Sequence, residues 1–414
     1  MSVNRKIFHN SQISLQKYVQ SKGKHVLNSV KTYRRVNSGD AKNWGTEVRF
    51  YIPRQGNQYL KCVNLRLDLP ALTGFSGGSF VRWCNNVLLR AFDRFELWSG
   101  GQMILQRFPD EITYNILPNI KYEQWQKMSE DIAWDESTTS RNTKAASAQN
   151  LVIDLKYIFD ILQKPFPIHL MKDEQQALEV RCIFKNNQDR VIQTDHTTRP
   201  DIQPSDLFLE CTYGHQPMVS KFQVEAHKAS YKKNKIGSQW YSHEYKRRNH
   251  PVQAGAGVEQ DIEIRQFENK SLNNIIFLVR DTADLTTAYA RDYDDNLKAV
   301  TSFQIKDGSD NLYYKEAQIT DTEYRKFLLD SFNFCGVDKV YNRNSYYIYF
   351  GEDASKEYDH KGVKEFCGAF DTHPYNDLRL NLYLADTVSA KTIDIIATES
   401  KRIAIVAGNL KILH

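Results

Sequence analysis

The chain has 414 residues, enough for two or three domains with large cores. Aromatic residues make up 12% of it, which suits strands and wide interfaces, and the absence of helix-favouring heptads excludes a coiled coil. No run of about 18 apolar residues is present, and the start, MSVNRKIFHNSQ, lacks the apolar core of a secretory signal. We therefore expect no membrane-spanning helix, and a protein that is made and kept in a cytosol-like compartment.

The formal net charge of +5 is modest, but it is unevenly distributed. No acidic residue precedes Asp40, whereas the same stretch carries Arg5, Lys6, Lys17, Lys22, Lys24, Lys31, Arg34 and Arg35. We interpret residues 1–40 as a basic N-terminal arm. Such an arm is either simply solvated or bound to an acidic partner such as nucleic acid, a minor protein or an anionic membrane.

The segment after the arm shows strand periodicity. Every second side chain from residue 63 to 69 is apolar and those between are polar, a period of two that predicts a half-buried strand. Pro70 ends this strand, because proline cannot donate a ladder hydrogen bond. The alternation returns at Phe95 and Leu97, and residues 99–101 (SGG) then supply a tight turn in which positive φ is tolerated. These residues predict a β-hairpin.

Further along, the sequence suggests two strand-rich units. A helical insert is expected near residues 110–128, and the Ser/Thr/Asn-rich stretch 135–149 favours a polar loop. Residues 195–205 contain two prolines and are interpreted as a linker. The predicted organisation is an arm at 1–40, a first unit at 41–195, a linker at 196–206 and a second unit at 207–414.

In the second unit, the apolar run 275–279 (IIFLV) predicts a strand with both faces covered. Residues 320–332 predict a helix, because Thr320 and Glu323 have capping-box spacing. Leucines alternate again from 378 to 384, and the isoleucines at 393, 395, 403 and 405 predict two more short strands. Many short alternating strands with turns between them indicate sandwiches or barrels.

A second basic cluster contains Lys228, Lys232, Lys233, Lys235, Lys246, Arg247 and Arg248. It is interleaved with the aromatic residues Tyr231, Trp240, Tyr241 and Tyr245. This mixture can stack nucleobases, and an interface between protein subunits explains it equally well. The sequence leaves both interpretations open.

Motifs for enzymatic chemistry are missing: the sequence contains no G-x-x-x-x-G-K-[ST], H-E-x-x-H or G-x-S-x-G. The eleven histidines include no His-x-His pair of the kind that binds metal in some jelly rolls, and the acidic run Asp292, Asp294, Asp295 and Asn296 has Leu297 where a calcium loop needs glycine. We expect no catalytic residue, cofactor or metal ligand. Free thiols are expected at Cys62, Cys84, Cys182, Cys211, Cys335 and Cys367.

Several motifs, taken in order, carry a resemblance. They are FYIPRQG at 50–56, LPALT at 69–73, VRWCNNV at 81–87 and GGQ at 100–102. Residues 151–159, 166–168 and 177–184 resemble a strand, a proline-rich bend and a further strand, and residues 378–413 resemble a set of closing strands. In this order and spacing, the motifs are similar to those of double jelly-roll major capsid proteins of the large eukaryotic DNA virus and virophage lineage.

The resemblance implies an all-β fold of two consecutive eight-stranded jelly-roll β-sandwiches with short helical inserts. It implies a structural, non-enzymatic role, in which a homotrimer forms a pseudo-hexagonal capsomer that tiles an icosahedral viral shell. The expected location is the virion capsid, assembled in the host cell cytoplasm. Expected partners are other copies of the chain, minor capsid, cement and penton proteins and, through the basic arm, an inner membrane or the genome.

Two other roles stay open at this point. A trimeric scaffold paralogue, which shapes a membrane during virion assembly and is later lost, would have the same fold. An unrelated jelly-roll carbohydrate-binding module would share the sandwich architecture without the shell function.

Overall fold

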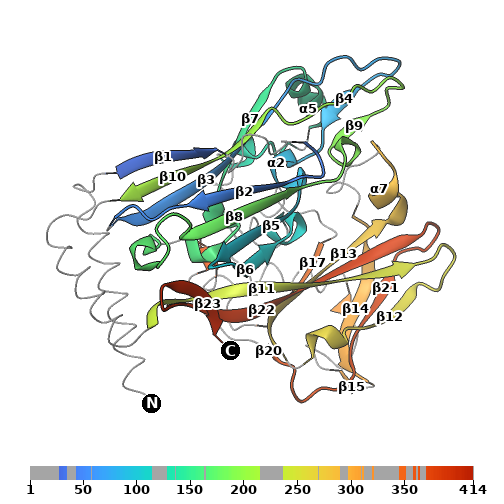
Figure 1. Ribbon diagram of the computed structural model, residues 1–414. Coiled ribbons are helices and arrows are strands. Elements are labelled where there is room, and N and C mark those ends of the chain that lie inside the picture. Colours follow the sequence, from blue (N-terminus) through green and yellow to red (C-terminus); the bar gives the residue numbers. More distant parts are fainter. Residues whose placement is uncertain are drawn as a thin grey trace.

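The computed structural model describes residues 28–34, 43–56, 58–113, 128–135, 137–162, 165–214, 236–268, 270–289, 297–308, 310–311, 319–320, 345–350, 358–359, 362–363 and 370–413. These residues form two β-sandwiches that pack against each other (Figure 1). Within them, no helix is long and apolar enough to cross a membrane.

The first sandwich consists of two four-stranded antiparallel sheets that face each other. One sheet has the order β1 (Asn28–Arg34), β10 (Asp206–Gly214), β3 (Tyr59–Leu69) and β7 (Gln149–Asp154). The other has the order β2 (Glu47–Ile52), β8 (Leu178–Phe184), β5 (Phe92–Ser99) and β6 (Gln102–Arg107). Together they provide the eight strands that a jelly roll requires.

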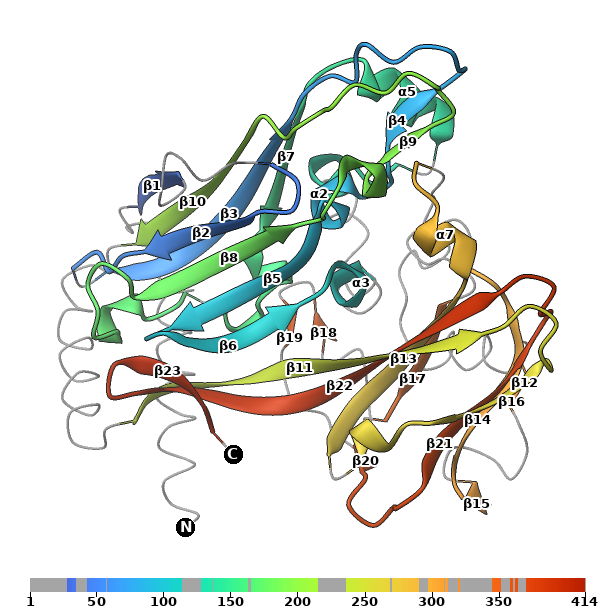
Figure 2. The same cartoon turned by 45° about the vertical axis from the view of Figure 1, so that its right-hand side comes forward.

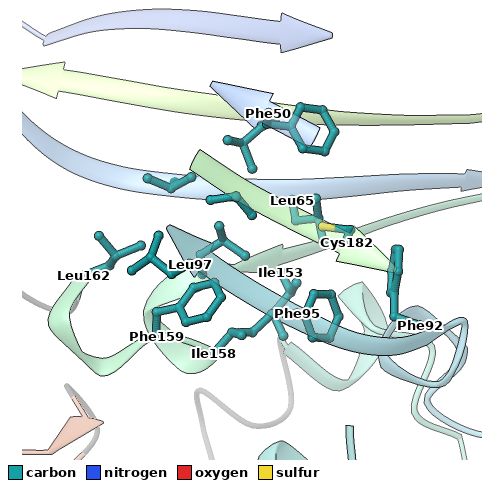
Figure 3. Close-up of a cluster of buried hydrophobic side chains, with 14 of the residues drawn as sticks. Phe50, Leu65, Phe92, Phe95, Leu97, Ile153, Ile158, Phe159, Leu162 and Cys182 are labelled. Atoms are coloured by element: carbon teal, nitrogen blue, oxygen red, sulfur yellow. The ribbon is translucent and has the colours of Figure 1, made fainter. Parts of the chain in front are cut away.

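The core of this sandwich comes from the inward positions of both sheets. Leu65 and Ile153 project from one sheet, Phe50, Phe95 and Cys182 project from the other, and all five are buried (Figure 3). The predicted alternation along residues 63–69 is confirmed, since its apolar members are buried and its polar members are half-buried. None of the four described cysteines forms a disulfide, as predicted.

The predicted hairpin is also confirmed, because β5 pairs with β6. Gly100 and Gly101 at its turn have φ values of 56° and 78°, which side chains larger than hydrogen rarely adopt. A Cβ atom on Gly100 would lie 2.9 Å from Oδ1 of Asn409, so glycine also allows the C-terminal strand to come close.

The strand pairing corrects two predicted boundaries. Strand β10 was assigned to the second unit, yet it pairs with β3 along its length. Strand β1 lies inside the predicted arm, yet it pairs with β10. The physical reason is that Leu207, Leu209 and Cys211 alternate with half-buried residues and are themselves fully buried in the first core. The first sandwich therefore extends from residue 28 to 214, across the predicted linker.

The second sandwich also has two facing sheets. One contains β11 (Ile236–Val252), β22 (Lys391–Val406), β13 (Ser271–Asp281) and β17 (Ser345–Tyr349), with β20 (Phe370–Asp371) and β23 (Asn409–Leu413) at its sides. The other contains β12 (Glu259–Glu263), β21 (Leu378–Leu384), β14 (Val300–Asp307), β15 (Asp310–Asn311) and β16 (Ile319–Thr320). Two short pairs complete the strands: β4 (Val81–Trp83) with β9 (Ile192–Thr194), and β18 (Tyr358–Asp359) with β19 (Gly362–Val363).

Strand β13 is buried on both faces, as its apolar run predicted. Ile275, Phe277 and Val279 belong to the second core, while Ile276 and Leu278 are fully buried on the opposite face. The alternation at 378–384 is confirmed as β21. The two short strands predicted near the C-terminus are instead one long strand, β22, because the polar residues between the isoleucine pairs continue the ladder with β11.

The described helices are short. Among them, the α-helices are α2 (Val87–Arg90), α3 (Pro109–Glu111), α5 (Thr138–Ala145) and α7 (Thr282–Thr286). The 3-10 helices are η4 (Leu155–Tyr157), η5 (Asp160–Leu162), η6 (Ile168–Leu170), η7 (Gln188–Arg190) and η8 (Arg265–Phe267). Helix α5 replaces the predicted polar loop, because the Ser137 hydroxyl caps it by accepting from the Ser140 N–H at 3.2 Å.

Other predictions fall largely outside the described residues. The helical insert is helical at its start, in α3, and residues 114–127 are not described. Thr320, the predicted cap of the helix at 320–332, lies in β16, and residues 321–332 are outside the described part. The acidic run at 292–296 is outside it as well.

Candidate functional site at the junction of the two sandwiches

The structure places part of each basic segment. Lys31 and Arg34 lie on β1, opposite Cys211 and Phe208 of β10, and the other six basic residues of the arm are outside the described residues. In the second cluster, the residues from 246 to 248 lie on β11, whereas its four lysines before residue 236 are not described. The described part of the second cluster therefore belongs to a sheet and not to a loop.

Two aromatic residues of the second cluster are used inside the chain. The ring of Trp240 stacks on Phe166 of the first sandwich, with 5.3 Å between the ring centroids. The guanidinium of Arg107 lies over the ring of Tyr245, 4.7 Å from its centroid, and Tyr245 is buried. Both rings join the two sandwiches of one chain, a role that neither interpretation from the sequence had anticipated.

A cluster of charges, all buried except the partly exposed Arg247, lies where the sandwiches meet, and we call it the charge cluster. Its members are Arg90 of α2, Asp110 of α3, Arg247 of β11, Arg280 of β13 and Asp394 of β22. Asp110 accepts from Arg90 within the first sandwich. Its oxygens also lie 3.4 Å from Nη2 of Arg280 and 3.1 Å from Nη2 of Arg247, both from the second sandwich. Asp110 is thus a carboxylate shared by three arginines across the junction.

Asp394 forms ion pairs with two of these arginines. Its Oδ2 lies 2.5 Å from Nη1 of Arg280 and 3.0 Å from Nη2 of Arg247. Burial alone would raise the pKa of Asp110, but the positive charges of Arg90, Arg280 and Arg247 outweigh it and hold the pKa far below its usual range. Buried charges are tolerated only when paired, and separation of the sandwiches would break the ion pairs of Arg247 and Arg280 with Asp110.

A second polar contact lies further along the junction. Asp160 of η5 accepts from the Ser242 hydroxyl at 2.5 Å and from the His243 backbone N–H at 3.0 Å, both on β11. Arg107 of β6 places Nη2 3.6 Å from the same carboxylate. Burial opposes the charge of Asp160, yet the hydrogen bond from the His243 side chain and the charge of Arg107 lower its pKa.

A third contact is made by Tyr289, which follows α7. Its backbone N–H donates to the Asp189 carbonyl, and its carbonyl accepts from the Thr194 N–H, both at 3.1 Å. The Tyr289 hydroxyl accepts from Nε2 of Gln188 at 3.0 Å, and the guanidinium of Arg199 lies 4.3 Å from the centre of its ring. Tyr289 has a φ of 61°, a left-handed conformation that a tyrosine keeps only when its surroundings impose it.

This conformation leads to a sharp prediction for residue 289. Tyr289→Ala should lower the free energy of unfolding by about 2–4 kcal/mol, because the ring packing and the hydrogen bond are lost while the strain stays. Tyr289→Gly loses the same side chain but relieves the strain, so it should be more stable than the alanine variant by about 1 kcal/mol. Urea unfolding of both variants measures the difference, and an alanine variant at least as stable as the glycine variant would contradict the argument.

Arg247, Trp240 and Tyr245 were singled out in the sequence as parts of the second basic cluster, but the other junction residues were not. A signal existed in part: Asp394 interrupts a run of isoleucines, and Arg280 ends the apolar run of β13. A charge inside an apolar strand predicts a buried pair, but the partner cannot be named from one strand alone. In the described ranges, no group of three or more His, Cys, Asp or Glu side chains is arranged to hold a metal ion.

No protein-family model matches this sequence, and no curated protein matches it either. Solved structures do match. A chain of the PBCV-1 virus capsid is 13% identical, with 94% of this chain and 98% of that chain covered and a TM-score of 0.68. The Faustovirus major capsid protein is 10% identical, with 97% and 98% covered and a TM-score of 0.62. The mavirus major capsid protein is 11% identical, with 93% and 90% covered and a TM-score of 0.52.

These matches and the strand order define a double jelly-roll protein: one chain that builds two consecutive sandwiches. The predicted fold class is confirmed. The chain is similar over nearly its whole length to viral capsid proteins, and at identities of 10% to 13% the likeness establishes the fold.

Proposed function

We propose that the protein is a viral major capsid protein with a structural role, whose homotrimer forms a pseudo-hexagonal capsomer. The observation that carries the proposal is the match to the PBCV-1 capsid chain, which covers 94% of this chain and 98% of that one. Both sandwiches are included, so the likeness extends to how the two units are joined. A trimer of such chains has six similar lobes, which fit a hexagonal lattice.

The junction supports this role. A tile in a shell has to keep its two sandwiches in one orientation, because a change in the angle between them would be repeated at each lattice contact. Here Asp110, Asp160 and Tyr289 each bind residues of the other sandwich. Directional contacts of this kind define an angle better than apolar packing does, since hydrophobic burial has no preferred direction.

The outward face of β2, β8 and β5 offers a surface for lateral contacts. Arg181 lies over the ring of Trp98, 3.7 Å from its centroid, and Nε of Arg181 donates to Glu179 at 2.6 Å. Nε1 of Trp98 donates to Glu96 at 2.8 Å, and Glu96 also accepts from Arg94 at 2.7 Å. Because these charges are already paired within the sheet, a neighbouring copy can cover them at a smaller desolvation cost than isolated charges would require.

The proposal is tested with the purified full-length chain. Mass measurement in solution should give a trimer, and negative-stain microscopy at high concentration should show hexagonal blocks. A stable monomer under the same conditions would rule the capsomer out. Detection of the chain as the dominant protein of mature particles separates a capsid protein from a scaffold that is lost, and a specific hit on a glycan array would instead indicate a carbohydrate-binding module.

The finer partners stay predictions. Minor capsid, cement and penton proteins, and contact of the basic arm with a membrane or genome, rest on the sequence pattern of residues 1–40, most of which is not described. Assembly in the host cytoplasm is a prediction in the same sense.

A further inference from the structure

Strands β11 and β22 are longer than the sandwich to which they belong. The first part of β22, from Lys391 to Glu399, pairs with β13 on one side and with β11 on the other. Beyond it, residues 402–406 pair with β23 on one side and still with β11 on the other. Residues 236–243, 401–406 and 409–413 thus form a three-stranded extension, which we call the C-terminal ribbon. It runs beneath β6 of the first sandwich (Figure 2).

The apolar face of the ribbon belongs to the core of the first sandwich. Ile403, Ile405 and Leu410 are fully buried, and they belong to the first hydrophobic core and not to the second. Trp240, on the neighbouring strand of the ribbon, adds its stacking contact with Phe166. The last residues of the chain therefore provide part of a core whose own strands end at residue 214.

Backbone contacts hold the ribbon in one position. The N–H of Leu410 donates to the Ser99 hydroxyl at 3.1 Å, and the carbonyl of Gly408 accepts from the Lys172 N–H at 2.7 Å. Gly408 has a φ of 81°, and a Cβ atom there would lie 2.6 Å from Cβ of Lys172. Only glycine fits this close approach, so the turn between β22 and β23 is shaped to contact the first sandwich.

We propose that the C-terminal ribbon is a latch that closes the first sandwich in cis, so that this sandwich becomes fully packed only once residues 401–413 are in place. Synthesis runs from the N-terminus, so all eight strands of the first sandwich exist before Ile403, Ile405 and Leu410 do. A chain that lacks these residues leaves the first core without Ile403, Ile405 and Leu410, and the Ser99 hydroxyl without the Leu410 N–H. A chain truncated before the ribbon therefore has an incompletely packed first sandwich. This consequence does not depend on the proposed capsid role.

Point variants of the full-length chain test the latch. Leu410→Asn places a polar group in the first core, and Lys411→Asn, at the next and exposed position of β23, is the matched control. Hydrogen exchange of the Leu410 variant should be at least about tenfold faster around residues 99–107 and 166–172, with β13 of the second sandwich unchanged. The control should match the unmodified protein in both regions.

A second variant covers the case in which Leu410→Asn fails to fold. Gly408→Ala keeps every apolar side chain but clashes with Lys172, and it should accelerate exchange in the same two segments by a smaller factor. Equal acceleration in both sandwiches would overturn the proposal, because the ribbon would then be an ordinary part of a single cooperative unit. Unchanged exchange in the first sandwich would overturn it as well.

The latch and the shell role can fail separately. If the exchange pattern is as expected but the unmodified protein is a monomer, the latch stands and the capsomer does not. If trimers form and exchange is uniform, the opposite holds.

Discussion

Replacing Asp110 by asparagine should lower the free energy of unfolding by about 3–5 kcal/mol, the usual cost of removing one partner from a buried ion pair. The reason is that Arg90, Arg247 and Arg280 all use this carboxylate, and two of them come from the other sandwich. Asparagine keeps the size of the side chain but removes its charge. Urea unfolding of the purified variant measures the change.

Asp93→Asn is the matched control. Asp93 also binds basic residues, Lys185 at 3.2 Å and Arg94 at 3.5 Å, but its side chain is 47% exposed. Because water screens an exposed pair, we expect a loss of less than about 1 kcal/mol. If both variants lost the same free energy of unfolding, burial would not be what makes the ion pairs of the charge cluster stabilising.

The stability of the Asp110→Asn variant should also depend on pH differently from that of the unmodified protein. The pKa of Asp110 is lowered in the folded protein, so the folded state binds fewer protons than the unfolded state as the pH falls through the usual carboxyl range near 4. The stabilisation is thus present above that range and is lost in acid, as the pH approaches the lowered pKa. The asparagine variant should lose stability less steeply between about pH 5 and pH 3 than the unmodified protein.

Glu111, the next residue in the chain, should give the opposite dependence of stability on pH. Glu111 is fully buried in α3, its Oε2 accepts from the Phe108 N–H at 2.9 Å, and Oε1 has no hydrogen-bond partner among the described residues. Burial raises its pKa to about 8, although Arg107 and Arg247 pull it down. The folded protein therefore binds a proton that the unfolded chain releases near pH 4.5, and stability should fall as the pH rises from about 4.5 to about 8.

Glu111→Gln removes this dependence, because glutamine is neutral at every pH and can still accept from the Phe108 N–H. The unmodified protein should lose stability at up to about 1.4 kcal/mol per pH unit between pH 5 and pH 8, and the glutamine variant should lose clearly less. Above pH 8 the variant should be the more stable of the two. Urea unfolding at a series of pH values measures both slopes, and Glu130→Gln, at an exposed position, is the control. Parallel curves for Glu111→Gln and the unmodified protein would contradict the raised pKa.

Asp110 and Glu111 are adjacent and equally acidic in the sequence, yet their pKa values shift in opposite directions. Asp110 points to three arginines, two of which arrive from strands more than 130 positions further along the chain. Glu111 has one backbone donor and little else. Nothing in the local sequence distinguishes them, because the difference lies in residues that only the fold brings near.

Strands were predictable where buried apolar residues alternate with more exposed polar ones. The alternations at 63–69 and 378–384 identified β3 and β21, and the SGG turn identified the β5–β6 hairpin. Prediction failed where tertiary contacts decided the outcome. Strand β22 continues through polar residues because β11 supplies partners along its length, and β10 joins the first sandwich because β3 is available beside it. Helix α5 forms in a polar stretch because a serine caps it.

By itself the sequence determined that this chain builds strands, where several of them turn, and that they form sandwiches, because side-chain periodicity and turn chemistry act over a few residues. Only the tertiary structure decided which strands share a sheet, that three separate polar contacts join the sandwiches, and that the last residues complete the first core. Periodicity tells which face of a strand is buried, but not what covers it. The cover for Ile403 and Leu410 lies more than 200 residues away in the chain, and folding alone selects it.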